Sequence, residues 1–304
     1  MKIALKIDAD TYRGTSQGVP RLVKILKARN AGATFLFSLG PDHTGRAITR
    51  VFRAGFLGKV RRTSVLEHYG IKTLLYGTLL PAPDIGSECA DIMRQARDAG
   101  FEVGIHAWDH VLWQDKVATA DEQWTRKQMD LARKRFEEIF GEPARIHGAA
   151  GWQMNRHAFV LTQRLRFNCS SDTRGDGPFL PVYQGKIVAC VQLPTTLPTL
   201  DEMIGLDGVN ADNVVENVLK LTERDTPRDH VFTLHAELEG MKFAPLFEQL
   251  LDGWRTQGHE LVSLGGYLDS LAFNKLPLHE IATGPIHGRS GSLAMQGRHV
   301  LPSR

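Results

Sequence analysis

Short apolar runs alternate with helix-period segments along most of this chain, and this alternation restricts its possible folds more than any other feature. The runs are short enough for strands, and the intervening segments have the 3.6-residue repeat of helices that cover one face of a sheet. The expected strands are residues 3–7, 33–38, 101–106, 145–149, 167–171, 231–235 and 260–263. The expected helices are residues 19–29, 85–99, 121–140, 156–165, 211–222 and 244–256.

Strands joined through helices predict βαβ units and a mostly parallel sheet. About seven such strands indicate an α/β fold in which the sheet curls into a closed or nearly closed (β/α) barrel. The functional site is then expected at the carboxyl ends of the strands. A doubly wound open sheet is the alternative, but no Gly-x-Gly-x-x-Gly follows the first strand to support it.

Two segments interrupt the alternation, and a third follows it. We expect one domain over residues 1–273, with insertions at 45–83 and 175–206 and a poorly ordered C-terminal tail at 274–304. The second insertion, rich in Pro and Thr, is expected to be a long loop or a hairpin over the barrel mouth. The first interleaves cations with large apolar side chains, so residues 46–80 could lie in a membrane interface. The alternative is an ordinary helix packed on the barrel with a basic edge.

Composition limits the binding partners and the cellular compartment expected for this protein. A net charge of +3 does not by itself indicate a nucleic-acid binder, so no nucleic acid is expected as a partner. The three cysteines are widely spaced and form no Cys-x-x-Cys pair, which fits a reducing cytosol. The chain reaches Asp8 too early for the apolar region of a signal peptide, and no apolar run is long enough to span a bilayer.

Two acids and two histidines form a candidate metal site. Asp8 and Asp10 share one side of an extended chain, where two carboxylates need a metal, a shared proton or a cation to compensate them. His106 and His110 are four residues apart and face the same way on a helical turn. Asp10, His106 and His110 would make a set of two imidazoles and one carboxylate that leaves coordination positions open. Each motif alone could instead be an acidic turn or a surface histidine pair.

The remaining polar residues at strand ends suggest acid–base roles. Asp8 would accept a proton from a metal-bound water, and His235 would protonate the leaving atom. Asp172 closes another strand and could hold His235 in the right tautomer. The joint placement of these groups at four strand ends is much more specific than any one motif.

These residues resemble a known superfamily, the NodB-homology polysaccharide deacetylases. The resemblance lies in five motifs, which are in order Ile7-Asp8-Ala9-Asp10, His106-Ala-Trp-Asp-His110, Ala149-Ala-Gly151-Trp152, Ser171-Asp172-Thr-Arg174 and Leu234-His235. It implies a distorted (β/α) barrel and metal-dependent removal of an N-acyl group from an amino sugar. Longer stretches, including Asp-Ala-Asp-Thr-Tyr-Arg-Gly-Thr and His-Ala-Glu-Leu-Glu-Gly, are similar to the deformylases of 4-deoxy-4-formamido-L-arabinose linked to undecaprenyl phosphate.

The resemblance carries several expectations. The enzyme would use one divalent ion (Zn, Mn or Co) and release formate at the cytoplasmic face of the inner membrane. Its product, 4-amino-4-deoxy-L-arabinose on the carrier lipid, would serve lipid A modification and resistance to polymyxin-like peptides. Another NodB-type amide hydrolase, acting on an N-acetyl amino sugar or a cyclic imide or ureide, is the alternative. An inert sugar- or membrane-binding module on the same fold is a third.

The third motif departs from the superfamily, because it lacks the Arg that holds the catalytic Asp. We expect Arg174 to supply that cation, with substrate binding or surface packing as its alternative role. Arg13 could meet the phosphate of the substrate, although a capping or surface role is equally open. Trp108, Gly151 and Trp152 are expected to contact the sugar or prenyl carbons, whereas buried aromatic residues are more often core.

Overall fold

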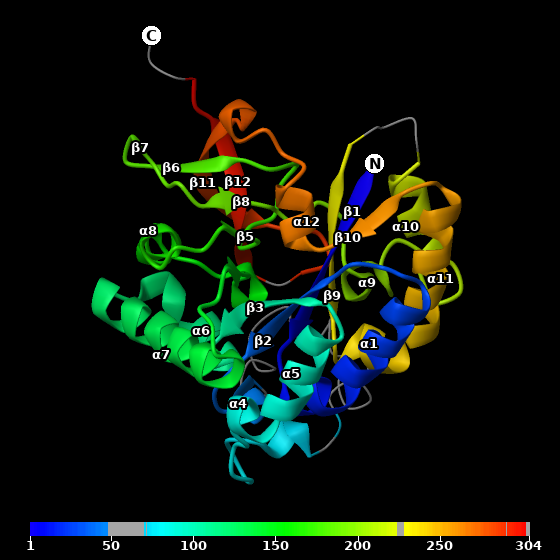
Figure 1. The fold of residues 1–304 in the computed structure, drawn as a ribbon, viewed down its shortest axis with the longest axis horizontal. Coiled ribbons are helices and arrows are strands. Elements are labelled where there is room, and N and C mark those ends of the chain that lie inside the picture. Colours follow the sequence, from blue (N-terminus) through cyan, green and yellow to red (C-terminus); the bar gives the residue numbers. More distant parts are fainter. Residues whose placement is uncertain (48–69, 71, 224–227, 290, 302–304) are drawn as a thin grey trace.

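The computed structural model describes residues 1–47, 70, 72–223, 228–289 and 291–301 (Figure 1). Most of the basic insertion, including the cations from Arg50 to Arg62 on which the membrane interpretation depends, lies outside the described residues. Among the helices that the structure describes, none has both the length and the apolar character needed to cross a bilayer.

Strand β1 (Lys2–Ala9) is the centre of the main sheet. It pairs in parallel with β2 (Thr34–Ser38), β9 (His230–His235) and β10 (Glu260–Val262). All residues of β1 after the first are buried. A strand covered on both faces needs no polar alternation, which explains its nearly continuous apolar sequence.

The path of the sheet runs β10-β1-β2-β3-β4-β5-β8, and every pairing along it is parallel. These seven strands curl through 203°, which makes a half-barrel and confirms the predicted α/β barrel class. The other strands are β3 (Glu102–Ala107), β4 (Ile146–His147), β5 (Cys169–Ser170) and β8 (Val191–Gln192).

The two ends of the curled sheet approach each other after β8. The backbone N–H of Thr196 donates to the carbonyl oxygen of Val231 in β9 over 3.1 Å. The hydroxyl groups of Thr195 and Thr233 lie 2.7 Å apart. The segment expected to be a loop or hairpin at 175–206 therefore contributes one strand of the barrel and the link to β9.

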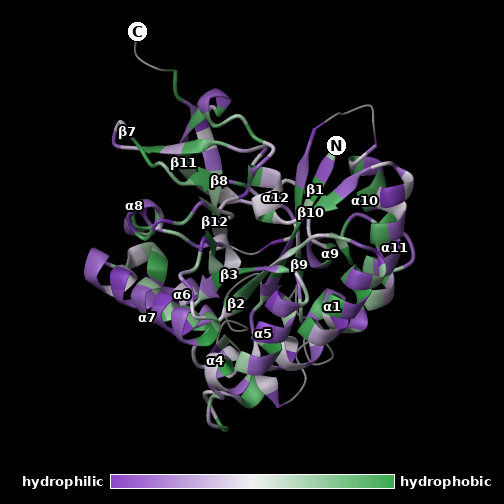
Figure 2. Cartoon of the chain, in the orientation of Figure 1, coloured by the Kyte–Doolittle hydropathy of each residue, from purple (hydrophilic) through white to green (hydrophobic). Residues whose placement is uncertain are grey.

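Helices cover the outside of the half-barrel (Figure 1). Figure 2 shows hydrophobic residues concentrated on the central strands, whereas the helices carry much of the hydrophilic colour. The helices are α1 (Val19–Ala28), α4 (Ile85–Glu88), α5 (Ala90–Asp98), α6 (His110–Lys116), α7 (Glu122–Phe140), α8 (Arg156–Arg164), α9 (Leu200–Met203), α10 (Val214–Leu221), α11 (Ala244–Thr256) and α12 (Leu264–Leu268). Short π-helical segments are η1 (Gly14–Gly18) and η6 (Leu238–Lys242), and 3-10 turns are η3 (Thr73–Leu75), η4 (Val117–Thr119), η5 (Ala150–Trp152) and η7 (Phe273–Lys275).

A second sheet, in the order β12-β11-β6-β7, corrects the expectation of a poorly ordered tail. Its strands are β6 (Leu180–Tyr183), β7 (Lys186–Ile187), β11 (Leu278–Pro285) and β12 (Ser292–His299). The C-terminal hairpin pairs with β6 from the second insertion, so its order depends on residues far away in the sequence. Two backbone hydrogen bonds, from Arg174 to Ala294 and from Gln296 to Arg174, join it to the barrel rim.

Candidate active site

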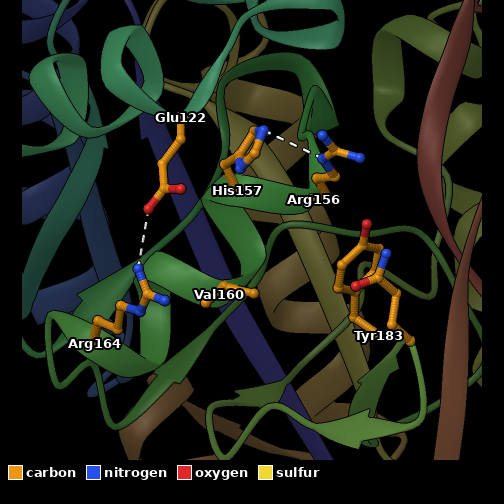
Figure 3. Close-up of a pocket in the computed structure, with 7 residues that line it drawn as sticks. Glu122, Arg156, His157, Val160, Arg164 and Tyr183 are labelled. Atoms are coloured by element: carbon orange, nitrogen blue, oxygen red, sulfur yellow. Dashed lines mark hydrogen bonds and ion pairs between the residues drawn. The ribbon is translucent and has the colours of Figure 1, made fainter.

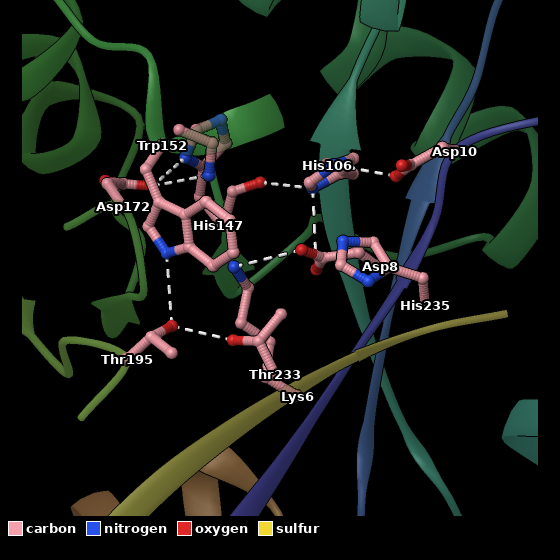
Figure 4. Close-up of polar contacts among 12 residues, drawn as sticks. Lys6, Asp8, Asp10, His106, His147, Trp152, Asp172, Thr195, Thr233 and His235 are labelled. Atoms are coloured by element: carbon pink, nitrogen blue, oxygen red, sulfur yellow. Dashed lines mark hydrogen bonds and ion pairs between the residues drawn. The ribbon is translucent and has the colours of Figure 1, made fainter. Parts of the chain in front are cut away.

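The structure brings Asp10, His106 and His110 together at the carboxyl ends of β1 and β3. Figure 4 shows His106 beside Asp10. One donor atom from each lies within 4.8 Å of the others. Nε2 of His106 is 3.1 Å from one carboxylate oxygen of Asp10, and Nε2 of His110 is 3.3 Å from the other. Asp109 caps α6 by accepting the backbone N–H of Leu112, so the turn after β3 places His110 beside His106.

The surroundings of His106 suit a cation. Its Nδ1 lies 2.6 Å from the carbonyl oxygen of Gly148 and must donate to it, so the neutral ring directs the lone pair of Nε2 at Asp10. Two acceptors facing each other at 3.1 Å need a proton or a metal between them. Burial lowers the pKa of His106, but Asp8 and Asp10 outweigh it and leave that pKa raised. Burial raises the pKa of Asp10, whereas His110 and His106 hold it below its usual value.

Asp8 is paired with a cation that the sequence reasoning missed. Nζ of Lys6 is fully buried, 3.1 Å from Oδ2 of Asp8 and 4.9 Å from the centre of the Trp152 ring. Arg174 does not take this place, which corrects our expectation. Its guanidinium binds Glu202 over 2.7 and 3.0 Å instead. The signal for Lys6 was a lysine inside an apolar run, two residues before Asp8 and therefore on the same side of the strand.

Asp172 does not hold His235, which is a second correction. One oxygen of Asp172 lies 2.7 Å from Nδ1 of His147 and accepts the backbone N–H of Ala149, and the other accepts from Gln192. Strands β4 and β5, which position His147 and Asp172, are neighbours, whereas β8 lies between β5 and β9 in the curled sheet. Burial raises the pKa of Asp172, but His147 outweighs it and leaves that pKa lowered.

His235 stands beside Asp8 rather than Asp172. The two residues are partners in the parallel register of β1 and β9, and Figure 4 shows the ring of His235 next to the Asp8 carboxylate. Within the described part of the chain, Nδ1 of His235 is buried and has no hydrogen-bond partner. His235 and Asp8, the proposed acid and base, therefore occupy paired positions on the neighbouring strands β9 and β1.

Two buried carboxyl groups after β9 were also missed. Oε1 of Glu237 accepts hydrogen bonds from the Asp10–Thr11 segment, and Oε2 of Glu239 accepts the backbone N–H of His235 over 2.7 Å. Burial raises the pKa of Glu239 to about 8. Burial and the charge of Asp10 raise the pKa of Glu237 well above its usual value. Both residues belong to the His-Ala-Glu-Leu-Glu-Gly stretch, but its spacing alone assigns them no role.

The expected substrate-contacting residues have different environments. Trp152 is only 1% exposed, and its indole N–H donates to Thr195, so it is a core residue rather than an open stacking surface. Gly151 has a φ of 60°, which favours glycine, and a Cβ there would lie 2.2 Å from the Gln114 amide, so that side chain would have to move. Trp108 and Arg13 are half-buried, with the Trp108 ring 5.2 Å from the Arg135 guanidinium, and both stay candidates for substrate contact.

A separate hollow of about 370 Å³ lies between α8 and the β6–β7 hairpin (Figure 3). It contains none of the candidate site residues; its lining is Glu122, Arg156, His157, Val160, Arg164, Tyr183 and Gln184. Glu122 and Arg164 form an ion pair of 3.1 Å across it. Two of the charged residues that line the hollow therefore already neutralise each other.

A protein family with a known sequence model matches much of this chain. Residues 2–168 match the family model described as polysaccharide deacetylase, which is more than half of the chain. The chain therefore belongs to the polysaccharide deacetylase family.

Curated relatives cover almost the whole chain. A protein of Shewanella sediminis, named as a probable 4-deoxy-4-formamido-L-arabinose-phosphoundecaprenol deformylase (ArnD), is 38% identical over 299 residues, 98% of this chain and 96% of the relative. A protein of Wigglesworthia glossinidia brevipalpis with the same name is 31% identical and covers 94% of this chain and 99% of the relative.

Solved structures share the fold at low identity. A Mycobacterium smegmatis protein named as a polysaccharide deacetylase has a TM-score of 0.62 at 17% identity, covering 90% of this chain and 91% of its own. A family 4 acetyl xylan esterase from Clostridium thermocellum, solved with a cobalt ion, has a TM-score of 0.51 at 13% identity, covering 90% and 94%. At these identities the likeness concerns the fold alone.

Proposed function

We propose that this protein hydrolyses the formamide of 4-deoxy-4-formamido-L-arabinose carried on undecaprenyl phosphate. Water is consumed, the carbon–nitrogen bond breaks, and formate and the free 4-amino sugar are formed. The observation that carries the proposal is the Asp10, His106 and His110 cluster beside Asp8, in a chain similar over nearly its full length to proteins named for this deformylation. The product would then serve lipid A modification and resistance to cationic peptides.

The donor set fits one divalent ion, with Zn, Mn or Co as candidates. Asp10, His106 and His110 offer one oxygen and two nitrogens, a mixed set that these ions accept. When bound, the ion supplies Lewis-acid polarisation of an amide carbonyl and lowers the pKa of a water. His106 is already oriented for this role, because its Nδ1 is occupied by the carbonyl of Gly148.

Asp8 and His235 carry out the two proton transfers of the reaction. Asp8, held by the buried ammonium of Lys6, accepts a proton from the attacking water. His235, on the neighbouring strand, donates a proton to the departing nitrogen. Because the two groups lie on adjacent strands, both can reach one amide without movement of the barrel.

The carrier lipid places the reaction at a membrane surface. Extracting a prenyl tail costs about 0.8 kcal/mol per CH₂, so the protein must come to the bilayer. Leu79 is 81% exposed in a turn that packs on the loop after β2, where the backbone N–H of Gly45 donates to Tyr76 over 3.0 Å. That loop also contacts the Asp10 segment, since Asp42 accepts the backbone N–H of Tyr12. We infer a peripheral enzyme at the cytoplasmic face, docked at this end of the barrel.

The direct test is mass spectrometry of the formamido-arabinose carrier lipid after incubation with the protein and each metal. We expect a mass loss of one CO unit and the release of formate, both abolished by a chelator and by Asp10→Ala. The N-acetyl analogue, run in parallel, tests acyl preference. Faster cleavage of the acetyl compound would overturn the deformylase assignment in favour of a deacetylase.

A further inference from the structure

The carboxyl group of Glu237 connects two parts of the site that come from opposite ends of the chain. It lies two residues after His235, and one of its oxygens accepts three hydrogen bonds. The donors are the backbone N–H of Asp10 at 3.0 Å, the backbone N–H of Thr11 at 2.8 Å and the hydroxyl of Thr11 at 2.7 Å. Glu237 is only 2% exposed, so water does not compete for these donors.

The hydrogen bonds continue from Thr11 into η1. The Thr11 hydroxyl oxygen also accepts the backbone N–H of Gly14 at 3.0 Å, and its carbonyl oxygen accepts from the backbone and the hydroxyl of Thr15. Among the described residues, the other oxygen of Glu237 has no hydrogen-bond partner. All the hydrogen bonding seen at this carboxyl group therefore serves the segment that holds the metal ligand Asp10.

Glycines allow the two segments to lie backbone against backbone. A Cβ on Gly14 would be 1.9 Å from Oε1 of Glu237, and a Cβ on Gly18 would be 2.0 Å from the carbonyl oxygen of Ala236. A Cβ on Gly240 would be 2.7 Å from the Cα of Gly18. Segments η1 and η6 are both single π-helical turns, a rare form that is frequent at functional sites.

We propose that Glu237 is a positioning residue, which fixes the metal ligand Asp10 relative to His235 before any ion binds. This inference rests on the proposed function, since it assumes that Asp10 ligates the catalytic metal. Groups that orient metal ligands typically contribute 10- to 100-fold to metal affinity. The same contacts set the distance between the metal and the proton donor, because Glu237 and His235 belong to one short segment.

The experiment is titration of the purified full-length protein with Zn²⁺, Mn²⁺ and Co²⁺ against a competing chelator. Glu237→Gln keeps an acceptor oxygen for Asp10 and Thr11, and we expect affinity near that of the wild type. Glu237→Leu removes the acceptor, and we expect about 10- to 100-fold weaker binding. Glu102→Leu is the control, because Glu102 is a half-buried carboxyl group that also accepts a backbone N–H, from Gly265, away from the site.

A second pair of variants keeps the proposal testable should Glu237→Leu not fold. Gly18→Ala forces the two segments apart while the carboxyl group remains, so it should also weaken metal binding. Gly177→Ala is its control, because a Cβ there meets nothing within 4 Å. Wild-type affinity in a folded Glu237→Leu variant, or in Gly18→Ala, would overturn the positioning role. Failure of Asp10→Ala to weaken binding would instead overturn the metal site, and the proposed function with it.

Discussion

Lys6 is the residue whose environment most restricts the chemistry of the site. Its ammonium group is fully buried, and its ion pair is with Asp8 at 3.1 Å. A buried charge that loses its partner costs far more than an exposed one. The pair therefore couples the stability of the barrel to the placement of the proposed base.

We expect Lys6→Met to lower the free energy of unfolding by about 3–5 kcal/mol, because it leaves the Asp8 carboxylate buried without its cation. The double variant Lys6→Met/Asp8→Asn should recover most of that loss, since neither charge remains. Urea unfolding of the wild type, both single variants and the double variant gives the coupling energy. Additive losses would show that the pair contributes nothing to stability.

Substitutions of Asp8 and His235 should reduce turnover without reducing metal binding. We expect Asp8→Asn and His235→Ala each to reduce kcat by about 100- to 10,000-fold, the usual contribution of a general base or acid. Metal content, measured by mass spectrometry of the purified variants, should stay at the wild-type level because neither residue is a proposed ligand. Near-normal turnover in either variant would remove its assigned role.

The proximity of Asp10, His106 and His110 could be predicted from the sequence, but the partners of the neighbouring polar residues could not. Asp10, His106 and His110 follow from a strand end and a helical spacing, both of which are local patterns. Asp172 was assigned to the wrong histidine, because its true partner depends on which strands are neighbours in the curled sheet. Arg174 was misplaced for the same reason, since Glu202 reaches it from α9, within the second insertion.

At the scale of elements, sequence periodicity identified the strands of the strand–helix alternation, including the two-residue strands β4 and β5, but not β8 or the strands of the second sheet. β1 and β2 are continuous apolar runs, whereas β8 has only two residues and gives no readable period. β11 and β12 are half-exposed; β12 pairs with β11, and β11 pairs with β6, an insertion strand about a hundred residues earlier. Such pairings between distant segments have no local signature.

The turn that exposes Leu79 provides a test of membrane docking. Leu79→Asp replaces an apolar side chain worth about 1.5–3 kcal/mol on burial, so binding to anionic liposomes should weaken by about tenfold or more. Ile187→Asp is the control, because Ile187 is 51% exposed on β7 in the second sheet. Cosedimentation measures both, and hydrolysis of a short-chain soluble analogue should survive in each. Equal loss in the two variants would mean that the turn is not the docking element.

For the whole molecule, buried Glu239 predicts a dependence of stability on pH. Its pKa rises from 4.5 to about 8 on folding, because burial disfavours the carboxylate. The folded state therefore holds a proton that the unfolded state has lost, and stability declines as the pH rises from 4.5 to 8. Each unit of pKa difference corresponds to about 1.4 kcal/mol.

Glu239→Gln should remove this part of the pH dependence, because the amide keeps an acceptor for the backbone N–H of His235 and cannot ionise. Urea unfolding of both proteins between pH 4.5 and about 8 gives their free energies of unfolding. In the difference between the two proteins, the contributions of other titrating groups cancel. The wild type should lose stability relative to the variant as the pH rises. Parallel profiles would show that Glu239 is ionised in the folded protein.

The central place of β1 has a consequence for how the protein is synthesised. A ribosome releases β1 first, yet its partners β9 and β10 come from the last third of the chain. The Glu237 oxygen that holds Asp10 follows 227 residues later, and at about 5–20 residues per second the delay is roughly 10–45 s of translation. Until Glu237 is added, the nascent chain lacks the carboxyl group that accepts the backbone N–H groups of Asp10 and Thr11. The hydrogen bonds around Asp10 are therefore completed only after most of the chain has been translated.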